Sequence, residues 1–174
     1  RAEIIWEKGT NRAEFFRGEV NKYGWVDTGS SFLPSEITAA FLWAQLEHLD
    51  DIQQKRRQIW QQYYEGLSGL QKNGEVCLPY IPDYASNNAH MFYLVAKNLD
   101  QRSQIIDALR QQEILAVFHY LSLHESPYYK EKYYGKQLVN ADRYSDCLLR
   151  LPLYYELSDK DISNITQTLF KKVW

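Results

Sequence analysis

The segment WVDTGSSFLPSEITAAFLWAQLE, residues 25–47, changes character halfway along its length. Its first half is a loop of small hydroxylated residues around Gly29. Its second half opens at Pro34, and no glycine or proline follows before Gly66. Large apolar residues recur at helical spacing or its multiples, at Leu42, Leu46, Leu49, Ile52, Ile59 and Tyr63. We therefore expect one helix over residues 34–65, roughly 45 Å long, with Pro34 at its first position. That length suits a bridge between two lobes better than a core helix.

The hydroxylated half of this segment raises the question of function. Thr28, Gly29, Ser30 and Ser31 stand shortly before the expected helix start. Helix N-termini present free N–H groups and the positive end of the helix dipole. The loop is therefore either a capping loop or one half of an anion-binding site, and the residues alone leave both readings open.

The residues before this segment are expected to form the end of a helix, over 2–8, followed by a long loop. Gly9 stops the helix, and residues 10–33 carry several aromatic side chains between glycines. Loops of this length are usually functional. Because Arg1 begins inside a helical pattern and is not an initiator methionine, we expect the chain to be a piece of a longer protein.

The residues after the helix predict a small α+β unit with a few antiparallel strands and helices packed on one face. A loop is expected over 66–74. Strands are expected at 76–80, 90–98 and 114–123, and helices at 101–112, 141–150 and 158–172. Asp100 and Ser158 are the expected N-caps of the first and last of these helices.

Composition limits the classes of function. The 174-residue chain has a formal net charge of −2, which disfavours a broad nucleic-acid or anionic-membrane footprint. No segment approaches the roughly 20 apolar residues that span a bilayer. The 14 tyrosines and 5 tryptophans suit surfaces that bind rings or sugars, and a tyrosine-rich core explains them equally well. Cys77 and Cys147 are expected to be reduced, buried thiols of a cytoplasmic protein.

Two of the four histidines are candidates for ligand contact. His119 and His124 lie at the end of an expected strand, where both side chains can line a cleft, although two surface imidazoles are an equal alternative. Their spacing fits no zinc pattern, so no metal site is expected. Without comparison to other proteins, the residues predict a ligand-contacting α+β fragment and no particular reaction. Two classes of function other than an enzyme stay open as alternatives: a noncatalytic carbohydrate- or nucleotide-binding module, and a helical interaction protein.

Four segments together resemble the DegT-type sugar aminotransferases, a family of fold-type I pyridoxal-phosphate (PLP) enzymes. They are GSSFLPSEITAAFLWAQLE, HMFYLVA, VFHYLSLHESPYY and LLRLPLYYELSDKDI, and the resemblance covers essentially the whole chain. It implies that residues 1–33 are the tail of the PLP-binding large domain and residues 34–65 the bridging helix. Residues 66–174 are then the C-terminal small domain, with a small antiparallel sheet and helices on one face.

The resemblance also implies the cofactor and how it is held. In this family PLP forms a Schiff base with a lysine of the large domain, and that lysine is expected upstream of Arg1. No catalytic residue is therefore expected in this chain. Ser30 and Ser31 match the loop that contacts the PLP phosphate of the partner subunit in a homodimer. Leu33 stands where many members have arginine, so a charged contact is lost there.

The substrate residues implied by the resemblance fall into two groups. His119 and His124 match paired histidines near the sugar nucleotide. The loop before the bridging helix supplies further candidates, with Arg12 or Lys22 suited to a diphosphate: Asn11, Arg12, Lys22, Tyr23 and Trp25. The implied reaction converts a dTDP-4-keto-6-deoxyhexose to the 4-amino sugar with glutamate as amino donor. The product would serve bacterial surface polysaccharide, either lipopolysaccharide or enterobacterial common antigen.

Overall fold

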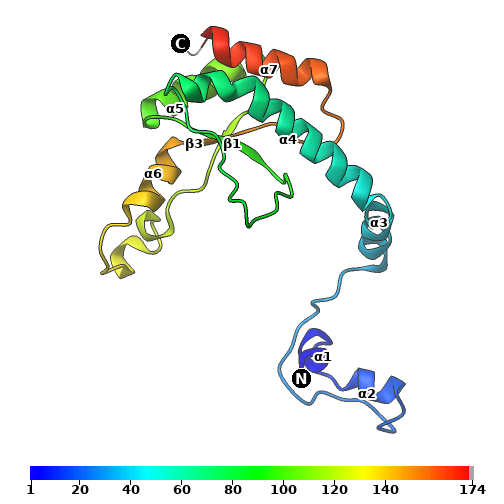
Figure 1. The fold of residues 1–174 in the computed structure, drawn as a ribbon. Helices are drawn as coiled ribbons and strands as arrows, with labels where there is room; N and C mark the ends of the chain where they lie inside the picture. Colours follow the sequence, from blue (N-terminus) through cyan, green and yellow to red (C-terminus); the bar gives the residue numbers. More distant parts are fainter. Residues whose placement is uncertain (173–174) are drawn as a thin grey trace. The chain divides into compact units, whose positions relative to one another are not determined.

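The structure, a computed structural model, describes residues 1–172 and divides into two compact units (Figure 1). The first unit, residues 1–49, contains α1 (Ala2–Trp6), α2 (Arg12–Phe16) and α3 (Glu36–Leu46). The expected first helix ends at Trp6, because Lys8 and Gly9 both have positive φ angles of 65° and 80°. The helix α2 is an addition to the expected loop.

The helix expected over 34–65 is two helices. Ser35 caps α3, because its side chain accepts a hydrogen bond from the backbone N–H of Thr38 at 3.3 Å, so Pro34 lies before the cap. The first helix stops after Leu46, and α4 runs from Leu49 to Lys72. Between them the N–H of His48 bonds the carbonyl of Gln45, which is the tighter spacing of a 3₁₀ turn. No glycine or proline marks this break, so sequence punctuation does not reveal it.

The loop expected over 66–74 is present only at residues 73–74, because α4 continues through both Gly66 and Gly69 to Lys72. These glycines allow close packing against α7 (Asp159–Lys172). A Cβ added at Gly66 would lie 3.1 Å from Cγ2 of Thr166, and one at Gly69 would lie 3.2 Å from Cζ of Phe170. The bare backbone therefore lets the two helices approach, which outweighs the poor helix propensity of glycine.

The second unit is built on a three-stranded antiparallel sheet in the order β1-β3-β2. Its strands are β1 (Phe92–Val95), β2 (Val117–Phe118) and β3 (Leu148–Leu151). Phe92 pairs with Leu151, and Val117 pairs with Arg150. The strand expected at 76–80 is reduced to a single bridge between Cys77 and Val95. The third strand, β3, occupies the end of what was expected to be a helix over 141–150.

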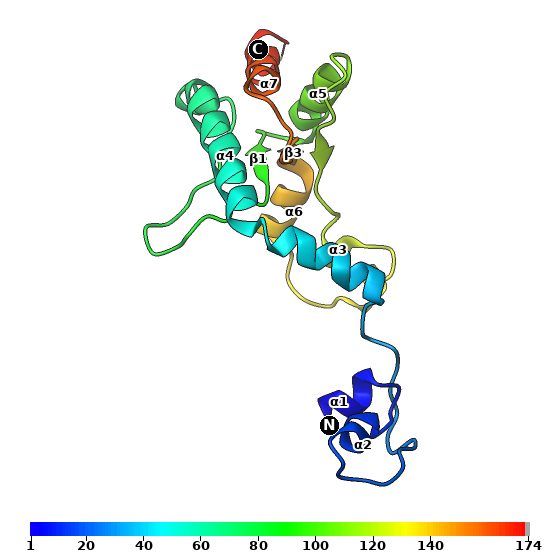
Figure 2. The same ribbon diagram turned by 90° about the vertical axis from the view of Figure 1, so that its right-hand side faces the viewer.

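The core of this unit lies between one sheet face and three helices: α4, α5 (Leu99–Arg110) and α7. Figure 2 shows these helices on one side of the sheet and α6 (Val139–Cys147) across from them. Fully buried side chains come from both layers, among them Tyr63, Phe92, Ile105, Leu149 and Leu169. The α+β class with a small antiparallel sheet is thus confirmed, and α6 is the exception to helices on one face.

Several local expectations change in the second unit. Asn98 caps α5 in place of Asp100, because its side chain accepts from the N–H of Gln101 at 2.9 Å. Ser158 does cap α7, with its hydroxyl accepting from the N–H of Asp161 at 3.2 Å. Two short 3₁₀ turns, η1 (Leu123–Glu125) and η2 (Lys130–Lys132), lie between β2 and α6.

The environments of the two cysteines differ, although both are free. Cys147 is buried, as expected, and burial raises the pKa of its thiol. Cys77 is exposed, which corrects the expectation of two buried thiols. Within residues 1–172 no helix has both the length and the apolar character needed to cross a membrane.

Candidate functional site

The hydroxylated loop of the first unit is held by a close crossing of two glycines. Gly9 and Gly29 approach so closely that a Cβ on Gly29 would overlap the backbone nitrogen of Gly9 and the carbonyl oxygen of Ile5. A Cβ on Gly9 would overlap the carbonyl oxygen of Asp27. The N–H of Asp27 in turn bonds the Gly9 carbonyl at 3.1 Å. The path of the loop therefore depends on glycine at both positions, a requirement that appears in the sequence only as two separate turn residues.

Ser30 and Ser31 lie on the strand-like stretch that follows this crossing. The Ser30 N–H bonds the carbonyl of Ile5 at 3.0 Å, and the Ser30 carbonyl accepts from the N–H of Lys8 at 3.2 Å. Ser31 forms an isolated bridge with Glu7. Among the described residues neither serine hydroxyl makes a hydrogen bond, and both side chains are exposed. Because Ser35 is the residue that caps α3, the hydroxyls of this loop are free of a capping role.

The Asp27 carboxylate, a charged group of the same loop, is held by two interactions. The N–H of Thr28 donates to the Asp27 carboxylate at 2.8 Å, and Arg1 lies 3.1 Å from the same group. The hydrogen bond from Thr28, with the charge of Arg1 second, lowers the pKa of the Asp27 carboxyl. The carboxylate therefore remains charged at neutral pH.

Two candidate substrate residues of the first unit, Asn11 and Arg12, already interact with other side chains or with the backbone of this unit. Asn11 closes the loop, because its side chain accepts from the N–H of Gly24 at 2.9 Å and donates to Glu14 at 3.1 Å. Arg12 lies 3.6 Å from the carboxylate of Glu7 and over the ring of Phe16. Both side chains are thus engaged within the unit.

Lys22, Tyr23 and Trp25 are open to solvent. Tyr23 packs edge-on against Phe15 with ring centroids 5.6 Å apart, while Trp25 is 82% exposed. Lys22 has no ion-pair partner among residues 1–172. These three side chains can contact a ligand without breaking an existing interaction.

His119 follows β2 in the second unit and is partly buried. Its Nδ1 atom is shielded from solvent and makes no hydrogen bond within the described part of the chain. The ring lies 5.6 Å from that of Tyr120. The strand ends at Phe118, so His119 lies at the strand end, as expected for a residue that lines a cleft. No residue within 1–172 forms a hydrogen bond with its Nδ1 atom.

His124 is buried in η1 and meets a carboxylate from α6. Its Nε2 lies 3.0 Å from Oδ1 of Asp142, which makes an ion pair whenever the ring is protonated. The two atoms are not aligned as a hydrogen bond. The ring also packs against Tyr133 at 5.2 Å. Asp142 was not among the sequence candidates, because only the fold brings the first turn of α6 to η1.

A polar cavity of about 380 Å³ lies next to this pair. Asp142 lines it, so the same carboxylate faces both the cavity and His124. The lining residues carry three carboxylates, two hydroxyls, one amide and one apolar side chain: Leu121, Ser122, Glu125, Gln137, Asp142, Ser145 and Asp146. No group of three metal-ligating side chains occurs in the described residues. The chemistry of this cavity is that of hydrogen bonding to hydroxyl groups.

The candidates therefore form two groups, one in each unit. Seven lie in residues 1–49, namely Asn11, Arg12, Lys22, Tyr23, Trp25, Ser30 and Ser31, and two lie in the second unit, namely His119 and His124. Within the first group, the Gly9–Gly29 crossing and the bonds of Asn11 hold the loop that carries the open side chains.

Comparison with solved structures finds the same fold in aminotransferases. TlmJ from Streptoalloteichus hindustanus is 20% identical, with a TM-score of 0.82 over 97% of this chain and 43% of its own. PseC from Helicobacter pylori, an aminotransferase of pseudoaminic acid biosynthesis, is 19% identical, with a TM-score of 0.83 over 98% and 44%. Spr1654 from Streptococcus pneumoniae, named as a sugar aminotransferase and solved in a PLP form, is 22% identical, with a TM-score of 0.80 over 98% and 42%.

These likenesses show the fold, and the chain spans less than half the length of each of the three structures. The sequence comparison goes further than the fold. The profile of the DegT/DnrJ/EryC1/StrS aminotransferase family matches residues 1–170. Because this match covers nearly the whole chain, the chain belongs to the DegT/DnrJ/EryC1/StrS aminotransferase family.

Proposed function

We propose that this chain is the C-terminal portion of a PLP-dependent nucleotide-sugar aminotransferase, called the parent below. The parent transfers an amino group from glutamate to a dTDP-4-keto-6-deoxyhexose and so makes the 4-amino sugar. The observation that carries the proposal is the family match over residues 1–170. The loop at residues 7–31 resembles that of dTDP-4-amino-4,6-dideoxygalactose transaminase, and from this resemblance we propose a role in surface polysaccharide synthesis in the cytoplasm.

The hydroxylated loop fits the phosphate of PLP. A phosphate needs several donors. The hydroxyls of Ser30 and Ser31, which make no hydrogen bond to the residues that the structure describes, supply two, and the glycine crossing holds the path of their backbone. In this proposal the contact is made to the cofactor of the partner subunit in a homodimer. Bound PLP supplies the electron sink that amino transfer requires, and its lysine belongs to the part of the parent upstream of Arg1.

In the second unit, His119 and the polar cavity beside His124 are suited to binding a sugar. His119 offers a shielded ring nitrogen that has no hydrogen-bond partner in the described part of the chain. The cavity beside His124 is lined by Ser122, Gln137 and Asp142, which accept and donate hydrogen bonds to hydroxyl groups. We propose that the sugar hydroxyls bind here. For the first unit we propose separately that the open side chains of Lys22 and Trp25 contact substrate, on a loop that Asn11, Arg12 and Tyr23 shape.

The proposed function also implies how the chain is divided between the domains of the parent. Residues 1–33 are proposed as the tail of the large domain, 34–65 as the bridging segment and 66–174 as the small domain. Every residue of α3 is exposed, including Ile37 at 83% and Phe41 at 71%. A helix that is apolar all round is normally covered. The large domain of the parent is the proposed cover.

Removal of one hydroxyl tests the cofactor assignment. In the PLP-loaded parent, Ser31→Ala is expected to weaken PLP retention by roughly 1 kcal/mol or more, because a hydrogen bond to a charged group is lost. Ser103→Ala is the matched control, since that exposed hydroxyl bonds only the Leu99 carbonyl. Equal PLP dissociation constants for both variants would contradict the assignment. Mixing Ser31→Ala subunits with subunits that lack the catalytic lysine shows whether the contact crosses the dimer.

A further inference from the structure

A short stretch of the first unit carries two candidate substrate residues without backbone hydrogen bonds of its own. Residues 20–23, which include Lys22 and Tyr23, make no backbone hydrogen bond with any residue that the structure describes. The backbone hydrogen bonds of this loop end at Glu19 and resume at Gly24. The positions of the two side chains therefore depend on how both ends of this stretch are held.

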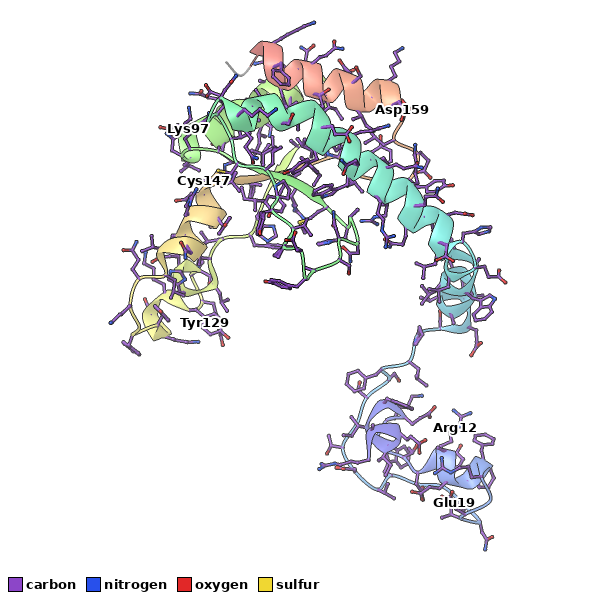
Figure 3. The ribbon with its side chains drawn as sticks, viewed as in Figure 1. Arg12, Glu19, Lys97, Tyr129, Cys147 and Asp159 are labelled. Carbon is purple, nitrogen blue, oxygen red and sulfur yellow. The ribbon has the colours of Figure 1, made fainter. Side chains whose placement is uncertain are left out.

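Arg17 holds the Glu19 end of the stretch through a two-pronged contact. Its Nε donates to Oε1 of Glu19 at 2.6 Å, and its Nη2 donates to Oε2 at 3.3 Å. Figure 3 labels Glu19, which lies beyond the end of α2. The paired geometry suits a guanidinium and a carboxylate. The hydrogen bonds from Arg17 also lower the pKa of the Glu19 carboxyl, so both groups are charged at neutral pH.

The third nitrogen of the same guanidinium bonds a carboxylate of α1. Nη1 of Arg17 donates to Oε2 of Glu3 at 3.1 Å. All three side chains are about half exposed. A single exposed ion pair contributes little to stability, but a bidentate arginine shared between two carboxylates is the arrangement in which such pairs do contribute. Arg17 therefore ties the start of the stretch to α1.

The helix α1 thereby anchors two loops in different ways. Its Ile5 carbonyl accepts from the N–H of Ser30 at 3.0 Å, which is a backbone contact to the hydroxylated loop. Glu3 holds the other loop through the side chain of Arg17. A side-chain substitution at Glu3 or Arg17 therefore releases the second loop and leaves the backbone contact of the first intact.

We propose that Arg17 is a positioning residue for the sugar-nucleotide substrate, an inference that rests on the function proposed above. Arg17 does not contact the substrate. It fixes Glu19, and with it the start of residues 20–23, against α1. Without Arg17, Lys22 and Tyr23 keep their chemistry but must be ordered when the substrate binds, and that ordering lowers affinity. The loss is expected in the KM for the sugar nucleotide, while PLP retention and the KM for glutamate stay unchanged.

Kinetics of the PLP-loaded parent with dTDP-4-keto-6-deoxyglucose and glutamate test this inference. Arg17→Gln and Glu3→Gln are each expected to raise the KM for the sugar nucleotide about twofold to tenfold. Because both substitutions remove the same contact, the double variant should be no worse than Arg17→Gln alone. Arg110→Gln is the matched control, since Arg110 also pairs with a carboxylate, that of Asp107, at 3.1 Å on a helix surface.

The sign of the Glu3→Gln effect separates positioning from simple attraction. If charge alone acted, the loss of a negative charge would lower the KM for an anionic substrate, whereas the loss of positioning raises it. Amide hydrogen exchange of the same proteins adds a readout that does not need turnover. The hydrogen-bonded amides of Glu19 and Gly24 are expected to exchange faster in both variants than in the wild type, and the amide of Ser30 at an unchanged rate.

Three outcomes overturn the inference. They are a lower KM in Glu3→Gln, equal effects of Arg17→Gln and Arg110→Gln, and PLP retention that falls together with substrate affinity in Arg17→Gln. A wild-type parent that transfers no amino group refutes the proposed function instead. In that case faster exchange at Glu19 and Gly24 in the variants supports the role of Arg17 in holding the loop, and unchanged exchange overturns it.

Discussion

Gly29→Ala is the change that most directly links the fold of the hydroxylated loop to its proposed role. The new Cβ would lie 2.9 Å from Cα of Gly9 and would overlap two further backbone atoms. Ordinary contact begins at 3.4 Å, so the two backbone segments must separate by about half an ångström at the least. No side-chain rotation relieves this overlap. Overpacking of this kind costs about 1–3 kcal/mol.

Separating the two backbone segments would strain the hydrogen bonds that hold the backbone of Ser30. These hydrogen bonds run from Ser30 to Ile5 at 3.0 Å and from Lys8 to Ser30 at 3.2 Å. In the parent, Gly29→Ala is therefore expected to weaken PLP retention at least as much as Ser31→Ala. Gly24→Ala is the control, because a Cβ at Gly24 meets nothing within 4 Å. Fluorescence titration with PLP gives the dissociation constants. If the two glycine variants retain PLP equally, the crossing does not support the cofactor site.

Three further predictions concern the second unit. Gly66→Ala should lower the free energy of unfolding in urea by up to about 2 kcal/mol, because the new methyl overpacks against Thr166. Adding Thr166→Ser should restore stability, and no recovery would refute the helix contact. Ser158→Ala should cost about 1 kcal/mol at pH 7 through loss of the α7 cap. Hydrogen bonds from Ser158 lower the pKa of Asp161, so the stabilisation from this carboxylate is full above its ordinary pKa of 3.8 and is lost as the pH falls below it. Thermal melts from pH 7 to pH 2 should show the wild-type advantage shrinking only at the acid end. His124→Ala should lower Tm in the isolated chain, because it removes a buried ring that packs against Tyr133 and lies beside the Asp142 carboxylate, and an unchanged Tm would make these contacts unimportant to the fold.

Elements with a strong local hydrophobic pattern could be predicted from the sequence. Elements that depend on contacts with residues far along the chain could not. Residues 90–98 and 158–172 have strong local patterns, and both elements were found there. Gly66 was misread because a glycine in a helix signals a break unless another helix packs on it, and α7 lies almost 100 residues later. The strand β3 was misread because its short apolar run suits a helix or a strand equally, and only pairing with β1 decides between them.

The candidate site also contains some residues that the sequence singled out and others that only the structure identifies. The residues alone singled out the hydroxylated loop and the two histidines, and the resemblance assigned their roles, whereas Asp142 and the Gly9–Gly29 crossing arise from contacts between distant residues. His119 and His124 looked equivalent in sequence. In the structure the shielded Nδ1 of His119 has no hydrogen-bond partner within residues 1–172, and His124 is buried against a carboxylate. We therefore expect His119→Ala to lower kcat/KM with little change in Tm, while His124→Ala affects both.

The central proposal is amino transfer to a nucleotide sugar, and its most direct test is a reaction of the purified parent. The parent, loaded with PLP, is incubated with glutamate and dTDP-4-keto-6-deoxyglucose, and the products are measured by mass spectrometry. We expect a dTDP-amino sugar and an equal amount of 2-oxoglutarate. The 174-residue chain alone is expected to form neither product and to bind no PLP that borohydride fixes to one of its lysines. A PLP-loaded parent that forms no amino sugar from this or any other nucleotide-linked keto sugar would contradict the proposal.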